Sequence, residues 1–280
     1  MRIRVWGCRG SLAAPGPHTV RYGGNTSCVE LRLGDGSLCV LDAGTGIRPL
    51  GLALGAERLQ PIHLLLTHLH LDHLEGLGFF APLWNPEAEI HVWGPPSPTH
   101  TLRERITGYF SPPLFPVHLS AVPARLEFHD APVEEWPIGS ASVRASPVEH
   151  PGPTVAYRFE ERGRSFAYVP DHEPALSADL HAPDGQWVSG LRLVEDVELL
   201  FHDAQYTDEE YAPRVGWGHS SLTDTVAFAR LARARRLALF HHDPGHSDEE
   251  LEAMLDGARR SFDGAGEVSL AAEGLEIELA

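Results

Sequence analysis

Residues 67–73 read Thr67-His68-Leu69-His70-Leu71-Asp72-His73, and the organisation of the chain can be worked out from them. They follow the apolar run 62–66, which is typical of a buried strand. Side chains alternate along an extended strand end, so His68 and His70 point to the same side. Asp72 and His73 come where the chain turns towards a helix and can face a second point nearby. The pattern therefore predicts ligands for two neighbouring cations.

Imidazole and carboxylate donors together suit zinc, and also manganese or iron. A histidine-rich surface loop is the alternative interpretation, since 17 His among 280 residues will produce chance pairs. Four donor side chains within six residues, at the end of a buried strand, make a much rarer coincidence. We expect two divalent metal ions, with zinc favoured over manganese and iron.

The composition is that of an acidic globular protein, 42% hydrophobic with a formal net charge of −17. All 22 basic residues are Arg, and the sequence contains no Lys. Because affinity for nucleic acid comes mainly from basic side chains, a nucleic-acid partner is disfavoured. Bound metal ions would add local positive charge, so a small anionic substrate remains compatible with the charge.

Three cysteines, Cys8, Cys28 and Cys39, form no CxxC pattern, which favours a reducing compartment. No apolar stretch approaches the length of a membrane span, and residues 1–6 lack the apolar core of a signal peptide. We expect a cytoplasmic protein with no membrane partner.

Short strand patterns recur through the chain and alternate with helical ones. Strands are expected at 2–6, 28–33, 38–42, 62–66, 90–94, 125–129, 141–147, 154–159, 165–169, 197–201, 236–240, 267–270 and 275–279. Helices are expected at 73–81, 222–234 and 247–262. The proline-rich stretch 95–123 is expected to be a loop, either bordering a pocket or connecting elements on the surface. With no repeat or linker, we expect one domain over residues 1–280, with two sheets face to face and helices outside.

Further candidate ligands follow later strand patterns. His150 comes directly after a strand, and Asp171 ends another. Each is weak evidence alone, but together they supply the third His and the bridging carboxylate that a two-metal site needs. Asp42 ends the strand 38–42 and is interpreted either as a partner for a ligand histidine or as a turn or capping residue.

The last third of the chain contributes two more clusters. The strand 197–201 leads to His202-Asp203-Ala204, and Gly218-His219-Ser220 precedes a helix. A His at a helix entrance can be aimed at a substrate. The strand 236–240 ends at His241 and His242.

Taken in order, these residues resemble the dinuclear hydrolases of the metallo-β-lactamase superfamily over essentially the whole chain, beginning with the HxHxDH motif. The resemblance implies an α/β (α+β) fold, a four-layer αββα sandwich with the metal ions at one edge. One ion would be held by His68, His70 and His150. The other would be held by Asp72, His73 and a late His, with Asp171 bridging both. For the late His the resemblance favours His241, with His242 as the alternative if the strand register differs by one.

The branch of the family is indicated by two extra signals. His202-Asp203-Ala204 followed by Gly218-His219-Ser220 resembles the HEA…HS(T) arrangement of ribonuclease Z, the tRNA 3′-processing endonuclease. It is also similar to phosphodiesterases that open cyclic ribose phosphates. In that group the second His assists departure of the leaving oxygen, and His219 is its match. Asp203 stands where ribonuclease Z has Glu. The glycine-rich arm with which ribonuclease Z holds tRNA has no counterpart in the sequence, which disfavours a tRNA substrate.

We therefore expect a metal-dependent hydrolase that cleaves a small or cyclic phosphodiester with a metal-bridging hydroxide. Asp72 would orient the nucleophile, and His219 would act as general acid. Arg9 and Arg214 are candidate phosphate contacts, with a solvated surface position as the alternative. Three other functions stay open: hydrolysis of a carboxylic ester, thioester or lactone, tRNA 3′ processing, and metal binding without turnover. Analogy with the family also allows a homodimer.

Overall fold

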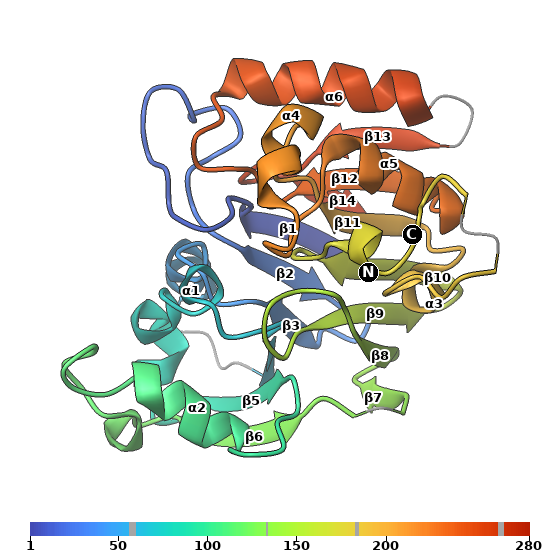
Figure 1. The fold of residues 1–280 in the computed structure, drawn as a ribbon. Helices are drawn as coiled ribbons and strands as arrows, with labels where there is room; N and C mark the ends of the chain where they lie inside the picture. The colour runs from blue at the N-terminus through green and yellow to red at the C-terminus, as the bar shows by residue number, and fades with distance from the viewer. Residues whose placement is uncertain (56–59, 133, 183–184, 263–265) are drawn as a thin grey trace.

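The computed structural model describes residues 1–280 apart from 56–59, 133, 183–184 and 263–265. Within the described residues, the strands form two seven-stranded mixed sheets that face each other (Figure 1). In spatial order the first sheet contains β14 (Glu276–Glu278), β1 (Arg2–Gly7), β2 (Cys28–Arg32), β3 (Leu38–Leu41), β4 (Ile62–Leu65), β5 (Glu89–Gly94) and β6 (Arg125–Asp130). The second contains β13 (Glu267–Leu270), β12 (Arg236–Phe240), β11 (Leu199–Asp203), β10 (Arg164–Val169), β9 (Val155–Glu161), β8 (Ala141–Pro147) and β7 (Trp136–Ile138).

Both sheets change from antiparallel to parallel pairing in the same way. In the first, β14, β1, β2 and β3 pair antiparallel, and β3 to β6 pair parallel. In the second, β7 to β10 pair antiparallel, and β10 to β13 pair parallel. Because neighbouring parallel strands end at the same edge, the residues that follow β4, β10, β11 and β12 are collected there.

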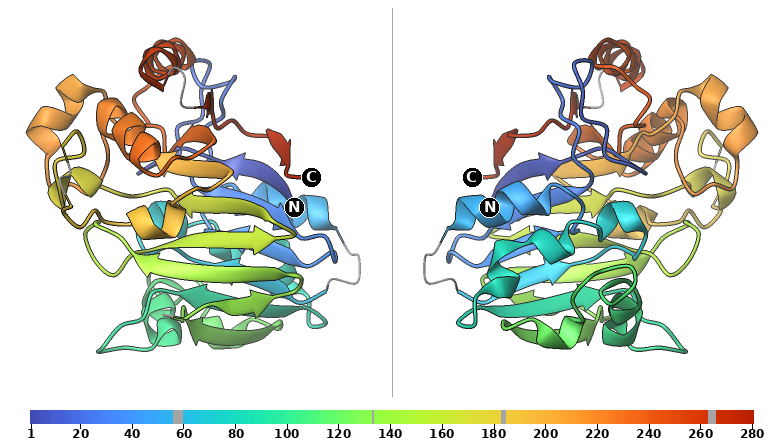
Figure 2. Two further views of the ribbon diagram at one scale, coloured as in Figure 1. Left: turned by 90° about the vertical axis from the view of Figure 1, so that its right-hand side faces the viewer. Right: turned by 90° about the vertical axis from the view of Figure 1, so that its left-hand side faces the viewer.

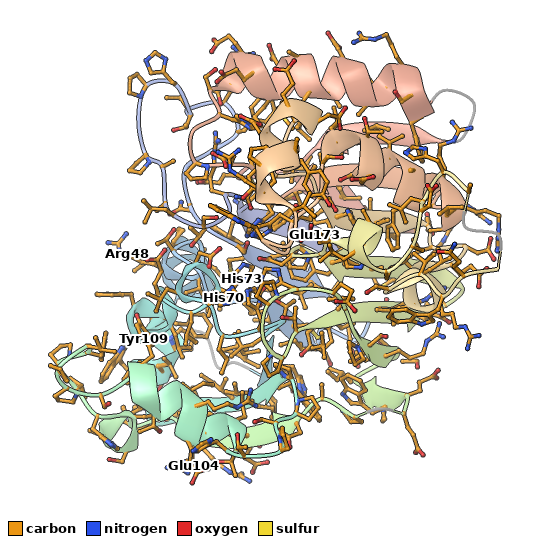
Figure 3. The ribbon with its side chains drawn as sticks, viewed as in Figure 1. Arg48, His70, His73, Glu104, Tyr109 and Glu173 are labelled. Atoms are coloured by element: carbon orange, nitrogen blue, oxygen red, sulfur yellow. The ribbon has the colours of Figure 1, made fainter. Side chains whose placement is uncertain are left out.

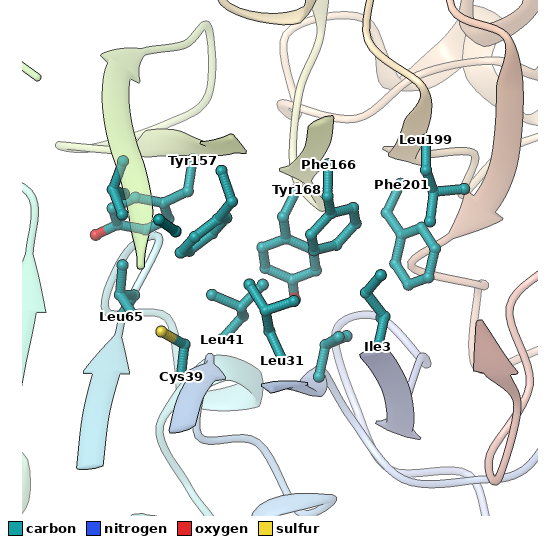
Figure 4. Packing of buried hydrophobic residues seen from close by; sticks show 14 of the residues in the cluster. Ile3, Leu31, Cys39, Leu41, Leu65, Tyr157, Phe166, Tyr168, Leu199 and Phe201 are labelled. Atoms are coloured by element: carbon teal, nitrogen blue, oxygen red, sulfur yellow. The ribbon is translucent and has the colours of Figure 1, made fainter. Parts of the chain in front are cut away.

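The core between the sheets is built from alternating side chains that point inward from both. In Figure 4, Ile3, Leu31 and Leu65 of the first sheet face Tyr157 and Phe166 of the second. All five are fully buried. Burying one such large apolar side chain contributes roughly 1.5–3 kcal/mol, so this layer fixes how the two sheets sit against each other.

Helices cover the outer faces and complete the four layers seen in Figure 2. The α-helices are α1 (Ile47–Leu54), α2 (Leu102–Tyr109), α3 (Leu191–Val194), α4 (Asp208–Tyr211), α5 (Leu222–Leu231) and α6 (Asp248–Phe262). The 3-10 segments are η1 (Leu71–His73), η2 (Leu77–Phe79), η3 (Ala81–Trp84), η4 (Leu119–Ala121), η5 (Pro174–Leu176) and η6 (Ala212–Arg214). The predicted four-layer sandwich is confirmed. No helix in the described part of the chain is both long and apolar enough to cross a membrane.

Two local predictions were wrong. The helix expected over 73–81 is instead the 3-10 segments η1, η2 and the start of η3. The backbone of Gly76 packs so closely on Gly44 that a Cβ at Gly76 would lie 2.0 Å from the Gly44 carbonyl oxygen, which a regular helix with side chains could not satisfy. The loop expected over 95–123 contains α2, which starts at a capping box formed by Thr101 and Glu104.

Candidate metal centre

Two groups of donor atoms meet at the edge where the parallel strands end. The first group consists of His68, His70 and His150, and the second of Asp72, His73, Asp171 and His241. Within each group the donor atoms all lie within 4.8 Å of one another. Figure 3 labels His70 and His73 at this edge. The arrangement is consistent with a dinuclear metal site.

The second group has the spacing of a metal coordination shell. His73 Nε2 lies 3.0 Å from Asp171 Oδ1 and 3.2 Å from Asp72 Oδ2. His241 Nε2 lies 3.2 Å from the same Asp72 oxygen and 3.3 Å from Asp171 Oδ2. Ligands at zinc bond lengths of 2.0–2.1 Å sit about 3.3 Å apart at the corners of a tetrahedron. The spacing of these four side chains therefore fits the ligands of one ion.

Asp171 also reaches the first group. Its Oδ2 lies 3.7 Å from His68 Nε2 and 3.7 Å from His150 Nε2. In the same group, His70 Nδ1 lies 3.1 Å from His150 Nε2. One carboxylate thus stands between both sets of imidazoles, which is the position of a bridging ligand.

Hydrogen bonds on the far side of the rings define which nitrogen faces the centre. Each of four rings donates from Nδ1 to an oxygen atom: His68 to Thr67 Oγ1, His73 to Asp42 Oδ2, His150 to the Gly218 carbonyl and His241 to Gln205 Oε1. A ring that donates from Nδ1 presents the lone pair of Nε2 on its other side. The surroundings therefore select the tautomer that binds a metal.

A buried ring nitrogen of the first group lacks a hydrogen-bond partner in the part of the chain that the structure describes. His68 Nε2 is buried and has no hydrogen-bond partner among the described residues, which costs about 1–3 kcal/mol in a folded protein. Burial lowers the pKa of His68 well below its usual value and lowers that of His150 to about 4, so both rings are neutral, the metal-binding form. These donors fit divalent ions of the zinc type.

Two ends of strands bend sharply to aim their side chains at this centre. Asp42 and His241 have φ values of 60° and 59°, in the left-handed region that residues other than Gly rarely adopt. Such a conformation costs on the order of 1–3 kcal/mol. Asp42 also accepts from the Thr67 amide at 2.7 Å and the Tyr168 hydroxyl at 3.0 Å. Of its two interpretations, the structure places Asp42 as the partner of a histidine in the cluster.

A second acid–histidine pair lies beside both groups. Asp203 Oδ2 is 2.8 Å from His219 Nδ1, and the His219 ring stacks on His241 at 4.9 Å between centroids. Burial opposes the charged form of His219, but Asp203 prevails and raises the pKa of His219 to about 9. Asp203 can therefore orient His219, although ribonuclease Z has Glu at the matching position.

A family model, the Beta-lactamase superfamily domain, matches residues 39–242, well over half of the chain. The chain belongs to the metallo-β-lactamase superfamily. The predicted resemblance is thereby confirmed, and the matched range contains every candidate ligand at this centre.

The relatives of this metallo-β-lactamase-fold chain include proteins of the predicted branch. A ribonuclease Z of Porphyromonas gingivalis is 24% identical, and the alignment covers 93% of this chain and 94% of the relative. The fold is shared with YhfI of Bacillus subtilis, at a TM-score of 0.70, 19% identity and 99% coverage of each chain. It is also shared with a diphosphatase of the PhnP family, at a TM-score of 0.68, 21% identity and coverage of 100% of this chain and 98% of that one.

Three residues considered as alternatives lie away from the centre. His242 is buried with its Nε2 2.9 Å from the Ala271 carbonyl, so His241 is the late His that faces the cluster. His202 faces His172 and packs on Phe228 in the core. The prediction that Arg9 contacts substrate phosphate is wrong. Arg9 is fully buried and donates to the carbonyl oxygens of residues 23, 243 and 246.

Two residues of the site did not emerge from the sequence, Gln205 and Glu173. Gln205 holds His241 at Nδ1. Glu173 is fully buried and accepts from the amides of Gly216 and Gly218 at 2.7 and 2.6 Å and from the Tyr211 hydroxyl at 2.9 Å. Only their position in the sequence could have indicated them. Each lies two residues after an acidic candidate residue that comes at the end of a buried strand.

Glu173 positions the loop that supplies His219. The same loop provides the Gly218 carbonyl that holds His150, so one carboxylate supports both His219 and His150 from behind. We expect Glu173→Gln to reduce the free energy of unfolding by about 3 kcal/mol, since hydrogen bonds to a charged acceptor contribute about 1.5–3 kcal/mol each. The Gln side chain is uncharged, and its NH2 group would face an N–H or O–H group that now donates to a carboxylate oxygen. Turnover should fall more than substrate affinity.

Urea unfolding and steady-state kinetics check this prediction. Glu149→Gln, a nearby glutamate whose carboxylate makes no hydrogen bond among the described contacts, is the matched control. Unchanged stability and kinetics for Glu173→Gln would show that the loop is held by other contacts.

Proposed function

We propose that this protein is a metal-dependent phosphodiesterase that cleaves a small or cyclic phosphodiester. One observation carries the proposal: His219, held by Asp203, stands directly beside a bridging arrangement of ligands. Metal binding alone does not require an extra, oriented His next to a complete ligand set. Cleavage of a phosphodiester with a poor leaving group does, because the departing alkoxide needs a proton.

The proposed ligands divide between two ions. One ion is assigned to His68, His70 and His150, the other to Asp72, His73 and His241, and Asp171 is shared. Zinc is the favoured metal, with manganese and iron as alternatives. Bound there, two divalent ions supply Lewis-acid polarisation of a phosphoryl group and activation of a water molecule.

Asp72 has a second task in this proposal. Its Oδ2 accepts from the Ser11 amide at 2.8 Å and lies close to two imidazoles. Burial by itself would raise its pKa, but His73 and His241 hold the pKa well below the usual range, so the carboxylate stays ionised. An ionised Asp72 can orient an attacking water by accepting its hydrogen bond.

His219 is assigned the task of protonating the leaving oxygen. Its Nδ1 is engaged by Asp203, so the proton on Nε2 is the one available to a leaving oxygen. A pKa of about 9 keeps the ring protonated at neutral pH. Tyr206 lies beside it at 5.9 Å between ring centroids, and the Arg214 guanidinium lies 5.1 Å above the Tyr206 ring, which brings one cation to the rim of the site.

Processing of tRNA is the competing candidate, because curated relatives over nearly the whole chain are ribonucleases Z. The net charge of −17 and the lack of Lys argue against it, since a tRNA backbone is bound mainly through basic side chains. Acyl hydrolysis is the other candidate on this fold. A thioester would give the Asp203–His219 pair less to do, because a thiolate departs without a proton more readily than an alkoxide does.

A substrate panel tests the proposal. Zinc- and manganese-loaded protein is assayed against bis-p-nitrophenyl phosphate, 2′,3′- and 3′,5′-cyclic nucleotides, a precursor tRNA and a thioester. We expect turnover of the small phosphodiesters in excess of the other two classes. Efficient cleavage of the precursor tRNA alone, or of the thioester alone, would overturn the proposed substrate class.

A further inference from the structure

A third group of donor side chains lies on the first sheet, away from the candidate metal centre. It consists of His91 on β5 and Glu127 and His129 on β6, whose donor atoms all lie within 4.8 Å of one another. The register of the two parallel strands places His91 opposite Glu127, and Trp93 opposite His129. His63 on β4 is paired with His91 on β5, and His63 precedes His68 by five residues. At about 3.3 Å per extended residue, this group is on the order of 15 Å from the metal centre.

We propose that this group, named here the β5–β6 site, is a separate binding site for a divalent transition metal of the zinc class. His91 Nδ1 lies 3.1 Å from His129 Nε2 and 3.5 Å from Glu127 Oε2. One separation is slightly shorter and the other slightly longer than the distance of about 3.3 Å expected between two ligand atoms of a tetrahedral zinc site. Two imidazoles and one carboxylate select zinc, copper or nickel over magnesium and calcium.

The surroundings prepare His91 as a ligand. Its Nε2 lies 3.1 Å from Glu89 Oε1, which accepts the ring proton and leaves the Nδ1 lone pair facing His129 and Glu127. Arg125 contacts both Glu89 and Glu127, which fixes the two carboxylates. This carboxylate–histidine pair is the support that a metal-binding imidazole receives in proteins.

Aromatic packing holds the second imidazole. The His129 ring stacks on Trp93 at 4.2 Å, and Trp93 stacks on Trp136 of β7 at 5.4 Å. Burial lowers the pKa of His129, as does His91, which keeps the ring in the neutral, metal-binding form. His63 stacks on His91 at 5.1 Å, but its Nδ1 accepts from Trp93 Nε1 at 3.4 Å, so we do not include it as a ligand.

A metal ion at the β5–β6 site would stabilise the fold by cross-linking two neighbouring strands. β6 is the outermost strand at one side of the first sheet in the described part of the chain (Figure 1). Such edge strands are less firmly held than central ones. A metal bound by one ligand from β5 and two from β6 would fasten this strand to its neighbour. The side chains of His91, Glu127 and Glu89 are 19%, 35% and 32% exposed, so an ion can enter from solvent.

Zinc content tests the proposal independently of hydrolysis. Full-length protein is stripped with chelator, reloaded with zinc, exchanged into zinc-free buffer and measured by elemental analysis. We expect His129→Asn to hold one equivalent less than the wild type and to hydrolyse bis-p-nitrophenyl phosphate at the wild-type rate. His118→Asn, at an exposed histidine outside the β5–β6 site, is the control and should match the wild type in both respects.

A second variant keeps the test decisive. Glu127→Gln keeps the size of a partly exposed side chain and removes one donor charge, so it should fold and should also lose one equivalent. Zinc should raise the melting temperature of the wild type more than that of Glu127→Gln. Equal zinc contents in the wild type and Glu127→Gln would overturn the proposal and leave an ordinary His91–His129 hydrogen bond.

Discussion

Replacing Asp171 with Ala should remove metal and activity together. This carboxylate lies within 3.7 Å of His68, His73, His150 and His241 at the nearest nitrogen atoms. Burial alone would raise its pKa, but His241 and His73 hold the pKa well below the usual range, so the group is a permanent anion among the rings. Its loss removes the carboxylate that lies close to both donor groups.

We expect Asp171→Ala, made together with His91→Asn so that the β5–β6 site binds no ion, to hold at most one metal per chain and to lose at least about 10³-fold in kcat/KM. Metal ions contribute several kcal/mol of charge stabilisation in the transition state, and each 1.36 kcal/mol is tenfold in rate. Elemental analysis and hydrolysis of bis-p-nitrophenyl phosphate measure the two losses. Asp256→Ala, at an exposed position on α6, is the control. Full metal content with unchanged turnover in Asp171→Ala would rule out the bridging role.

The second large effect is expected from His219→Ala, and it should separate chemistry from metal binding. His219 donates from Nδ1 to Asp203 and is not needed to complete either donor group. Metal content should therefore stay at the wild-type value. General acid catalysis contributes about 10²–10⁴-fold, so a phosphodiester with an alkyl leaving group should be cleaved that much more slowly. Nitrophenolate departs readily without a proton, so bis-p-nitrophenyl phosphate should be affected far less.

The pH profile gives an independent readout of His219. Its pKa is raised to about 9, so the acid form is present below that pH and is lost as the pH rises through it. The rate with the alkyl substrate should fall on the alkaline side, and bound cations nearby shift this fall to lower pH. The fall should be absent in His219→Ala. Loss of metal from that variant would show that His219 is a ligand and not an acid.

Much of the candidate site could be predicted because its residues follow the ends of parallel strands in chain order. A short apolar run marks each strand, and topology brings the ends together at one edge. The choice between His241 and His242 could not be made in this way. It depends on the left-handed backbone at His241, which turns that side chain to the cluster while His242 bonds the Ala271 carbonyl.

Other features depend on contacts between distant segments and leave no local pattern. Glu173 binds backbone amides more than forty positions away, and amides carry no sequence signal. The 3-10 segments after His73 follow from the close approach of Gly44 and Gly76. The β5–β6 site depends on the register of two parallel strands, which sets His91 opposite Glu127. The four-layer fold was predictable, whereas these pairings required the structure.

We propose that two metal ions held at this edge perform phosphodiester hydrolysis. The most direct test is elemental analysis of the purified protein and of its His91→Asn variant, with bis-p-nitrophenyl phosphate hydrolysis measured on the same samples. The variant removes any ion at the β5–β6 site, so its content reports the candidate metal centre alone. We predict two equivalents of divalent metal in the variant and turnover that disappears with chelator and returns with zinc or manganese. A variant that binds no metal and gains no activity when either ion is added would contradict a metal-dependent hydrolase.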